Sequence, residues 1–204
     1  IIFYGKGGHG KSEMVKFIME KIKEFEATKG VVSSDEYVFI QSFGKESTEA
    51  NLLGGIDLKK FNEENKLHYN VENSFMNYEY VILEEVFDAP NILLVLKDIL
   101  ESGWFRGGDQ QFKLRNKLLV VNTNINPTEL IDNVDPVEAN SYKAFMERFT
   151  IIKEVKWNSY STEDYKLLLN SKMGNHFTSD EIAIIADMID FINNKLFISP
   201  RVAL

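Results

Sequence analysis

A glycine-rich octet near the start of the chain constrains its fold more than any other feature. Residues 5–12 read GKGGHGKS and fit the pattern G-x-x-x-x-G-K-[ST], whose backbone N–H groups wrap phosphates. An apolar run at residues 1–4 precedes the octet and suits a buried strand. Residues 12–25 follow with helical spacing of apolar residues, at Met14, Phe17, Ile18, Ile22 and Phe25. The sequence therefore predicts a strand, a phosphate-binding loop and a helix in succession.

Each residue type in this loop has a chemical task. Glycines let the backbone adopt positive φ and approach phosphate oxygens without a Cβ clash. The lysine is expected to reach the β- and γ-phosphates, and the serine hydroxyl to ligate Mg²⁺. The histidine is expected to lend only its backbone N–H. The predicted phosphate-binding residues are Gly5, Gly7, Gly8, His9, Gly10, Lys11 and Ser12.

Size and composition bound the class of protein. A chain of 204 residues suits one α/β domain with a small appendage. The absence of cysteine excludes disulfides and thiolate metal sites, and the net charge of −8 argues against a broadly basic nucleic-acid surface. No apolar run reaches the length of a membrane span and no signal peptide is visible, so we expect a cytoplasmic protein. Since the sequence starts inside a strand and stops after a helix signal, we expect the ordered part of a longer protein.

Strands and helices alternate through most of the chain and then give way to helices alone. The expected strands are residues 1–4, 37–43, 80–83, 117–121 and 149–155. Helices are expected between them, notably at residues 90–102 and 138–147. This alternation implies a parallel sheet covered on both faces. Helices at residues 162–170 and 179–194 follow, so we place an α/β core at residues 1–157 and a small helical segment at residues 158–204.

An apolar strand that ends in two acids supplies a second element of the expected site. Residues 81–85 read VILEE. Glu84 is expected to hold Mg²⁺ directly or through water, and Glu85 to polarise the water that attacks the γ-phosphate. The usual first acid is Asp, and the longer Glu84 moves the carboxylate by about one C–C bond. The alternative is an acidic surface turn, which commonly follows a strand.

Polar residues also end the strand predicted at residues 117–121, where the chain continues as Asn122-Thr123-Asn124. An amide at the carboxyl end of a strand can position the attacking water or contact the γ-phosphate. We choose Asn124 for this role. The alternative is an asparagine that caps a turn before Asn126-Pro127.

Two arginines are candidates for sensing the γ-phosphate. Arg148 lies between a predicted helix and a strand, where it can reach the nucleotide of a neighbouring subunit. The alternative for Arg148 is a surface salt bridge with Glu147 or Glu154, which stabilises little. Arg201 follows Pro200, a helix-start signal, and can contact the nucleotide from the helical segment.

Taken together, these segments resemble AAA+ ATPases, specifically the MoxR-like branch that includes RavA-type proteins, over nearly the whole chain. Residues 48–57, TEANLLGGID, resemble the T-E-x-D-L-L-G segment of that branch, and residues 84–90, EEVFDAP, resemble its D-E-[IV]-F-K-A. Four further segments resemble, in order, the hairpin after helix 2, the sensor-1 strand, the end of the arginine-finger helix and the sensor-2 arginine: residues 100–108, 117–124, 148–149 and 199–201. Two positions depart from the pattern, since Glu84 replaces Asp and Asn51 stands where an acid is common.

The resemblance implies a P-loop NTPase fold of the AAA+ type, with a five-stranded parallel sheet followed by a small helical lid that is incomplete at the C-terminus. It implies rings, usually of six copies, that hydrolyse ATP with Mg²⁺ to remodel a partner protein that remains unidentified. Glu85 would activate water that Asn124 orients, while a neighbour's Arg148 and the same chain's Arg201 would contact the γ-phosphate. Loops near residues 55–70 and 103–109 would push on the partner.

A competing interpretation is a viral or phage superfamily 3 helicase that translocates on nucleic acid. That family shares a glycine-rich phosphate loop, two acids after a strand and a strand ending in Thr-Asn, here Thr123-Asn124. Residues 52–55 and 199–201 and the acidic balance favour the MoxR-like interpretation, although Lys113, Arg115 and Lys117 form a small basic run. A third interpretation is a nucleotide-gated scaffold with little hydrolysis, if Glu84 disables metal binding. The motifs define a triphosphate and leave ATP and GTP both open.

Overall fold

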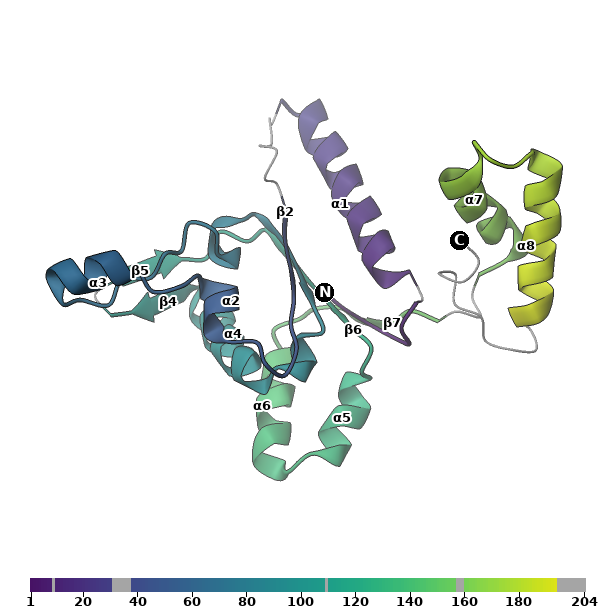
Figure 1. Ribbon diagram of the computed structural model, residues 1–204. Helices are drawn as coiled ribbons and strands as arrows, with labels where there is room; N and C mark the ends of the chain where they lie inside the picture. The colour runs from purple at the N-terminus through teal and green to yellow at the C-terminus, as the bar shows by residue number, and fades with distance from the viewer. Residues whose placement is uncertain (9, 31–37, 109, 157–159, 194–204) are drawn as a thin grey trace. The chain divides into compact units, whose positions relative to one another are not determined.

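A five-stranded parallel sheet is the centre of the computed structural model, which describes residues 1–8, 10–30, 38–108, 110–156 and 160–193 (Figure 1). Its strand order is β2-β3-β6-β1-β7, and every pair is parallel. The strands are β1 (Ile2–Tyr4), β2 (Val38–Ser42), β3 (Tyr80–Glu84), β6 (Leu118–Thr123) and β7 (Ile152–Glu154). The five strands predicted from the sequence are confirmed, and so is the fold class, an α/β sheet flanked by helices with a helical C-terminal part.

Helices connect these strands, as parallel pairing requires. The connecting helices are α1 (Lys11–Thr28), α2 (Glu49–Leu53), α3 (Leu58–Glu64), α4 (Pro90–Ser102), α5 (Pro127–Asn133) and α6 (Pro136–Met146), with 3₁₀ turns η1 (Phe75–Asn77) and η2 (Val86–Asp88). Helices α7 (Thr162–Met173) and α8 (Ser179–Asn193) follow the last strand. The predicted α1, α4, α6, α7 and α8 are confirmed, and α2, α3 and α5 lie between the strands, where helices were expected without stated bounds. Short helices of this kind carry too few turns to show a helical period in the sequence.

Helix α4 illustrates how local sequence defines an element. Pro90 occupies the first turn, where its missing N–H costs nothing, and Gly103 ends the helix at φ 71°. The side chains on one stripe are buried, namely Ile92, Leu93, Leu96 and Ile99. After Gly103 the chain enters an antiparallel hairpin of β4 (Trp104–Gly107) and β5 (Gln110–Lys113).

The two faces of the parallel sheet carry separate apolar clusters, because successive side chains of a strand point to opposite faces. On one face Tyr80, Ile82 and Val120 pack against Val15 and Met19 of α1. The other face packs in a larger cluster that includes residues of α4 and α6. Its members include Val81, Leu83, Val121, Leu96 and Phe145.

Only some of the apolar residues that predicted α1 face the sheet, and Ile22 is one of them. Val15 and Met19 are buried, whereas Phe17 and Phe25 are 58% and 59% exposed. Spacings of three and four residues establish a helical period, but two neighbouring stripes on one helix share that period. Contact with the sheet selects the stripe, and the exposed Phe17 ring instead lies under the Lys21 ammonium, 5.5 Å from its centroid.

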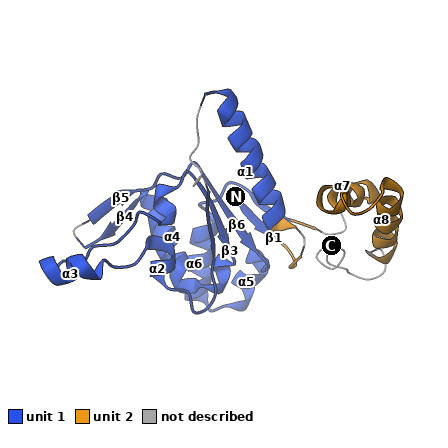
Figure 2. Ribbon diagram, turned by 45° about the horizontal axis from the view of Figure 1, so that its top comes forward, with its two compact units in different colours: residues 1–4, 12–154 blue, residues 5–11, 155–204 orange. Residues whose placement is uncertain are grey.

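The chain divides into two compact units, which Figure 2 colours separately. The first comprises residues 1–4 and 12–154, and the second comprises residues 5–11 and 155–204. The second unit has a small core of its own, formed by Tyr165, Leu169, Ile182, Ala186 and Ile189. The predicted domain boundary between residues 157 and 158 lies outside the described residues and stays a prediction. No helix within the described residues is long and apolar enough to cross a membrane.

Candidate nucleotide site

The glycine-rich loop joins the last residue of β1 to the first turn of α1. Gly5, Gly8 and Gly10 have φ values of 145°, 82° and 75°, which L side chains rarely adopt. Lys11 is 6% exposed, and its Nζ donates to the carbonyl oxygens of Gly5 at 2.6 Å and Lys6 at 3.1 Å. The loop thus folds around the lysine ammonium, and α1 begins there with the positive end of its dipole. Gly7 lies in the same loop, and His9 lies outside the described residues.

Ser12 and Glu84 meet at the carboxyl edge of the sheet. Ser12 is the second residue of α1, and Glu84 is the last residue of β3. The Ser12 hydroxyl donates a hydrogen bond to the Glu84 carboxylate, although 72 residues separate them. The two side chains chosen from the sequence as metal ligands therefore lie in direct contact.

Glu85 and Asn124 are also brought together, but through the asparagine backbone. Asn124 N–H donates to Glu85 Oε2 at 3.0 Å, and Glu85 N–H donates to the carbonyl of Asn122 at 2.8 Å. Glu85 adopts a left-handed conformation, with φ 56° and ψ 30°, which is uncommon for a residue with a side chain. Such strained positions cluster at functional sites because the surroundings must hold them. The strained turn orients the Glu85 carboxylate beside the end of β6.

The Ser12–Glu84 pair fits what Mg²⁺ requires beside a triphosphate. Mg²⁺ commonly binds one or two protein carboxylates together with phosphate oxygens and water, rather than a cage of protein ligands. The described residues contain no group of three His, Cys, Asp or Glu side chains placed to hold a metal ion. One hydroxyl and one carboxylate, both oxygen donors, suit such a hard cation.

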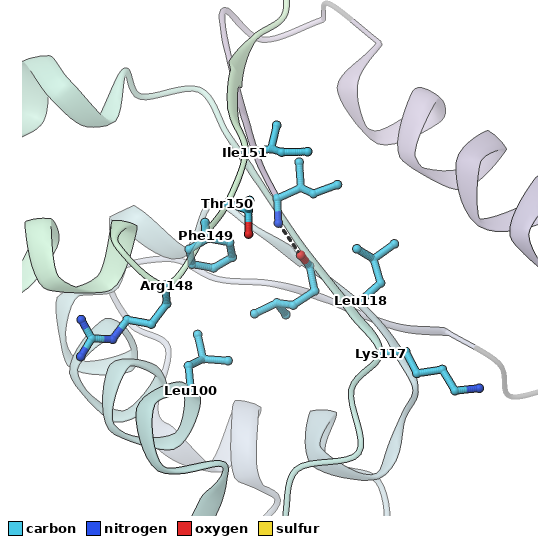
Figure 3. Close-up of a pocket in the computed structure, with 9 residues that line it drawn as sticks. Leu100, Lys117, Leu118, Arg148, Phe149, Thr150 and Ile151 are labelled. Atoms are coloured by element: carbon cyan, nitrogen blue, oxygen red, sulfur yellow. Dashed lines mark hydrogen bonds between the residues drawn. The ribbon is translucent and has the colours of Figure 1, made fainter.

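Arg148 lies at the opposite edge of the sheet from this pair. It lines a surface pocket of about 330 Å³ together with Ile1, Leu118 and Ile151, which stand at the amino ends of three parallel strands (Figure 3). Its Nη2 donates to Glu101 Oε2 at 2.6 Å, and its Nη1 donates to the carbonyl of Ala144. The fold therefore keeps Arg148 away from the Ser12–Glu84 pair of its own chain. Arg201 lies outside the described residues.

Two residues near the loop and the acids were not chosen as site residues from the sequence, where Asn124 was preferred to Asn122. Asn122 is 2% exposed and stands next to Glu84 in the register of β3 and β6. Tyr160 places its hydroxyl 3.5 Å from the position of a Cβ built on Gly10, within the second compact unit. Burial, and then Asp164, raise the pKa of Tyr160, so its hydroxyl stays neutral near the loop. A polar residue inside an apolar strand was the available signal for Asn122, whereas nothing in the sequence marks Tyr160.

The β4–β5 hairpin presents a mixed aromatic and cationic face to solvent. Phe105 and Phe112 point toward the core, where their rings stack with centroids 6.3 Å apart. The alternate residues Trp104, Arg106 and Lys113 are exposed, and Trp104 pairs with Lys113 across the two strands. The hairpin expected within residues 100–108 therefore exists, but it begins after α4 ends at Ser102 and extends to Lys113.

The sheet and its loops define a class of fold. A glycine-rich loop between the first strand and a helix, acids at the end of β3, and the strand order β2-β3-β6-β1-β7 make this an α/β P-loop fold.

Comparisons with known proteins support this fold assignment. No family model matches the sequence, and a search of curated proteins found no match. Among solved structures, the chain is similar to the closed state of Hsp104 with ATPγS and FITC-casein, with a TM-score of 0.58 and 14% identity over 96% of this chain and 39% of that chain. It is also similar to NtrX from Brucella abortus in complex with ATP, with a TM-score of 0.54 and 12% identity over 96% of this chain and 48% of that chain. NtrX in complex with ADP gives a TM-score of 0.56 and 14% identity, over 95% and 45% of the two chains. The chain thus spans less than half the length of each.

Proposed function

We propose that this chain binds ATP with Mg²⁺ and hydrolyses it as an AAA+ ATPase of the MoxR-like branch. One observation carries the proposal: the glycine-rich loop runs directly into Ser12, whose hydroxyl is bonded to Glu84, and the next acid, Glu85, is held by the backbone of Asn124. The similar structures of NtrX with ATP and ADP add support for the nucleotide.

Each residue of the site has a separate role in the proposed binding and hydrolysis of ATP. The loop amides and Lys11 bind the phosphates, which compete with the carbonyls of Gly5 and Lys6 for the ammonium. Ser12 and Glu84 would hold Mg²⁺, and the bound ion would neutralise charge on the phosphate oxygens. Glu85 takes the proton of the attacking water, and Asn124 helps to orient that water.

Assembly with a second copy of the chain supplies the remaining cation. Since Arg148 lies at the opposite edge of the sheet from Ser12, we propose that it acts on the nucleotide of a neighbouring subunit. Such a cation in trans can raise turnover by about 10³-fold or more. We further propose a ring, usually of six copies, that acts in the cytoplasm on a partner protein. Arg201 would contact the same nucleotide from the helical segment.

A nucleic-acid motor resembling the superfamily 3 helicases is the second candidate, and the exposed face of the β4–β5 hairpin favours it. Trp104, Arg106 and Lys113 combine stacking and positive charge, which suits a single strand. Lys117, the last member of the basic run, is engaged elsewhere, because it pairs with Glu79 at 2.7 Å and with Glu26 at 3.4 Å. The hydrogen bond with Glu79 is the largest cause of its raised pKa.

Titration calorimetry tests the proposed nucleotide. ATP added to the purified chain should release heat that increases with Mg²⁺, and Glu85→Gln should keep this binding while turnover falls by about 10²-fold or more. An absence of Mg²⁺-dependent heat in the wild-type chain would refute the proposed binding of ATP with Mg²⁺. A Glu85→Gln variant that hydrolyses ATP at the wild-type rate would show that Glu85 is not the base.

Turnover with and without single-stranded DNA separates the two candidates. The MoxR-like function predicts a rate that DNA leaves unchanged, in wild type and in the Arg106→Ala, Lys113→Ala double variant. Strong stimulation by DNA that disappears in the double variant would instead establish the hairpin as a nucleic-acid contact and replace the first candidate by the second.

A further inference from the structure

Asn122 stands beside the proposed metal ligand Glu84 on the same face of the sheet. The register pairs Asn122 with Glu84 on β3 and with Phe3 on β1. Alternation along β6 places Asn122 on the face of Val120, which packs against Val15 of α1. Alternation along β3 places Glu84 on that face too, in keeping with its bond to Ser12. Neighbouring strands are about 4.8 Å apart, so the amide and the carboxylate are within reach of each other.

The amide of Asn122 is buried and unpaired. The residue is 2% exposed, and neither Oδ1 nor Nδ2 finds a hydrogen-bond partner among the described residues. An amide offers two donors and an acceptor with two lone pairs, and leaving them unpaired in a sheet interior is costly. The preceding residues, Val120 and Val121, show that apolar side chains fit this strand. The Asn122 amide is therefore available to bond a neighbouring side chain whose own hydrogen bonding changes when a ligand binds.

We propose that Asn122 is a positioning residue of the magnesium site, an inference that rests on the proposed function. In the structure the Ser12 hydroxyl donates to Glu84. With Ser12 and Glu84 holding Mg²⁺, the Glu84 carboxylate would lose the Ser12 hydroxyl as donor, and Nδ2 of Asn122 would donate to it instead. A donor from β6 also steers the flexible Glu84 side chain, which is one methylene longer than the Asp usual at this position. Partners of this kind fix a ligand's orientation and tune the affinity for the metal.

The variant Asn122→Val tests this role with two measurements that do not depend on turnover. Removing an unpaired buried amide should raise the Tm of the nucleotide-free protein by about 2 °C or more. The same variant should lower the Mg²⁺-dependent gain in ATP affinity by about 10- to 100-fold, measured by calorimetry with Mg²⁺ against EDTA. ATP affinity in EDTA should stay at the wild-type value.

Thr123→Val is the matched control, on the same strand and the opposite face. Thr123 is fully buried, and its Oγ1 accepts a hydrogen bond from Ile125 N–H at 3.1 Å. This variant should lower the Tm and leave the effect of Mg²⁺ unchanged. The inference is overturned if Asn122→Val keeps the wild-type gain from Mg²⁺, or if its Tm without nucleotide stays level or falls. If Mg²⁺ does not raise the ATP affinity of the wild-type chain, both the proposed function and this inference are refuted.

Discussion

The contact between Ser12 and Glu84 can be tested by removing one hydroxyl. In Ser12→Ala the Glu84 carboxylate loses the donor that α1 supplies across the edge of the sheet. Hydrogen bonds to charged groups contribute about 1.5–3 kcal/mol, and because both side chains are only half-buried we expect about 1–2 kcal/mol. For a domain of this size, that loss lowers the Tm by about 2–8 °C.

Thermal unfolding without nucleotide measures this loss of stability, and two further variants serve as controls. Ser12→Thr keeps the hydroxyl and should stay close to wild type in Tm. Ser42→Ala changes an exposed serine of β2 that is paired in register with Glu84 of β3, and should shift stability by less than about 0.5 kcal/mol.

Nucleotide binding gives the second readout. Mg²⁺ should strengthen ATP binding in wild type and in Ser12→Thr, and have little effect in Ser12→Ala. If Ser12→Ala melts at the wild-type temperature and still responds to Mg²⁺, the hydroxyl neither holds Glu84 nor reaches the metal, and the reasoning fails.

Three further predictions follow from other parts of the chain. Arg148→Ala should bind ATP normally but lose about 10³-fold in turnover of the assembled protein, whereas Glu101→Gln, which removes the charge facing the same guanidinium, should keep turnover. An Arg148→Ala assembly with wild-type turnover would refute the role of Arg148 as an arginine finger. Gly54→Ala should lower the free energy of unfolding in urea by about 2 kcal/mol or more, because φ is 84° and the new Cβ would lie 1.9 Å from the Asn70 carbonyl oxygen. Gly55→Ala meets open space and should be nearly neutral, so equal stability of the two variants would contradict the turn geometry. Hydrogen bonds from Ser161 and Thr178 lower the pKa values of Asp164 and Glu181, so both carboxylates stabilise the fold above the ordinary carboxyl pKa, and this contribution is lost as pH falls through the lowered values. The Tm should therefore fall more steeply from pH 6 to pH 3 in wild type than in the Asp164→Asn, Glu181→Gln variant, and parallel falls in Tm would contradict this prediction.

The sequence by itself determined the order of strands and helices, the phosphate loop and the acids after the third predicted strand. These features are local. A glycine-rich turn, a run of apolar residues or a helical period lies within about 20 residues of chain, and each is dictated by backbone sterics and burial. For that reason the predicted strands and the longer helices were confirmed.

Only the tertiary structure decided which distant residues meet. The strand order places β6 between β1 and β3, and this brings Ser12 to Glu84 across 72 residues of sequence and Glu85 to the backbone of Asn124. Pairing in the sheet depends on crossover connections and on burial of both faces, which no local pattern encodes.

The same cause explains what the sequence reasoning missed. A helical period could not select Val15 over Phe17 as the buried side of α1, since that choice depends on the sheet beneath the helix. A motif could not show that Asn122 is enclosed without a partner or that Arg148 lies at the far edge of the sheet. Burial and distance are properties of the packed chain, so they become visible only when its elements are assembled.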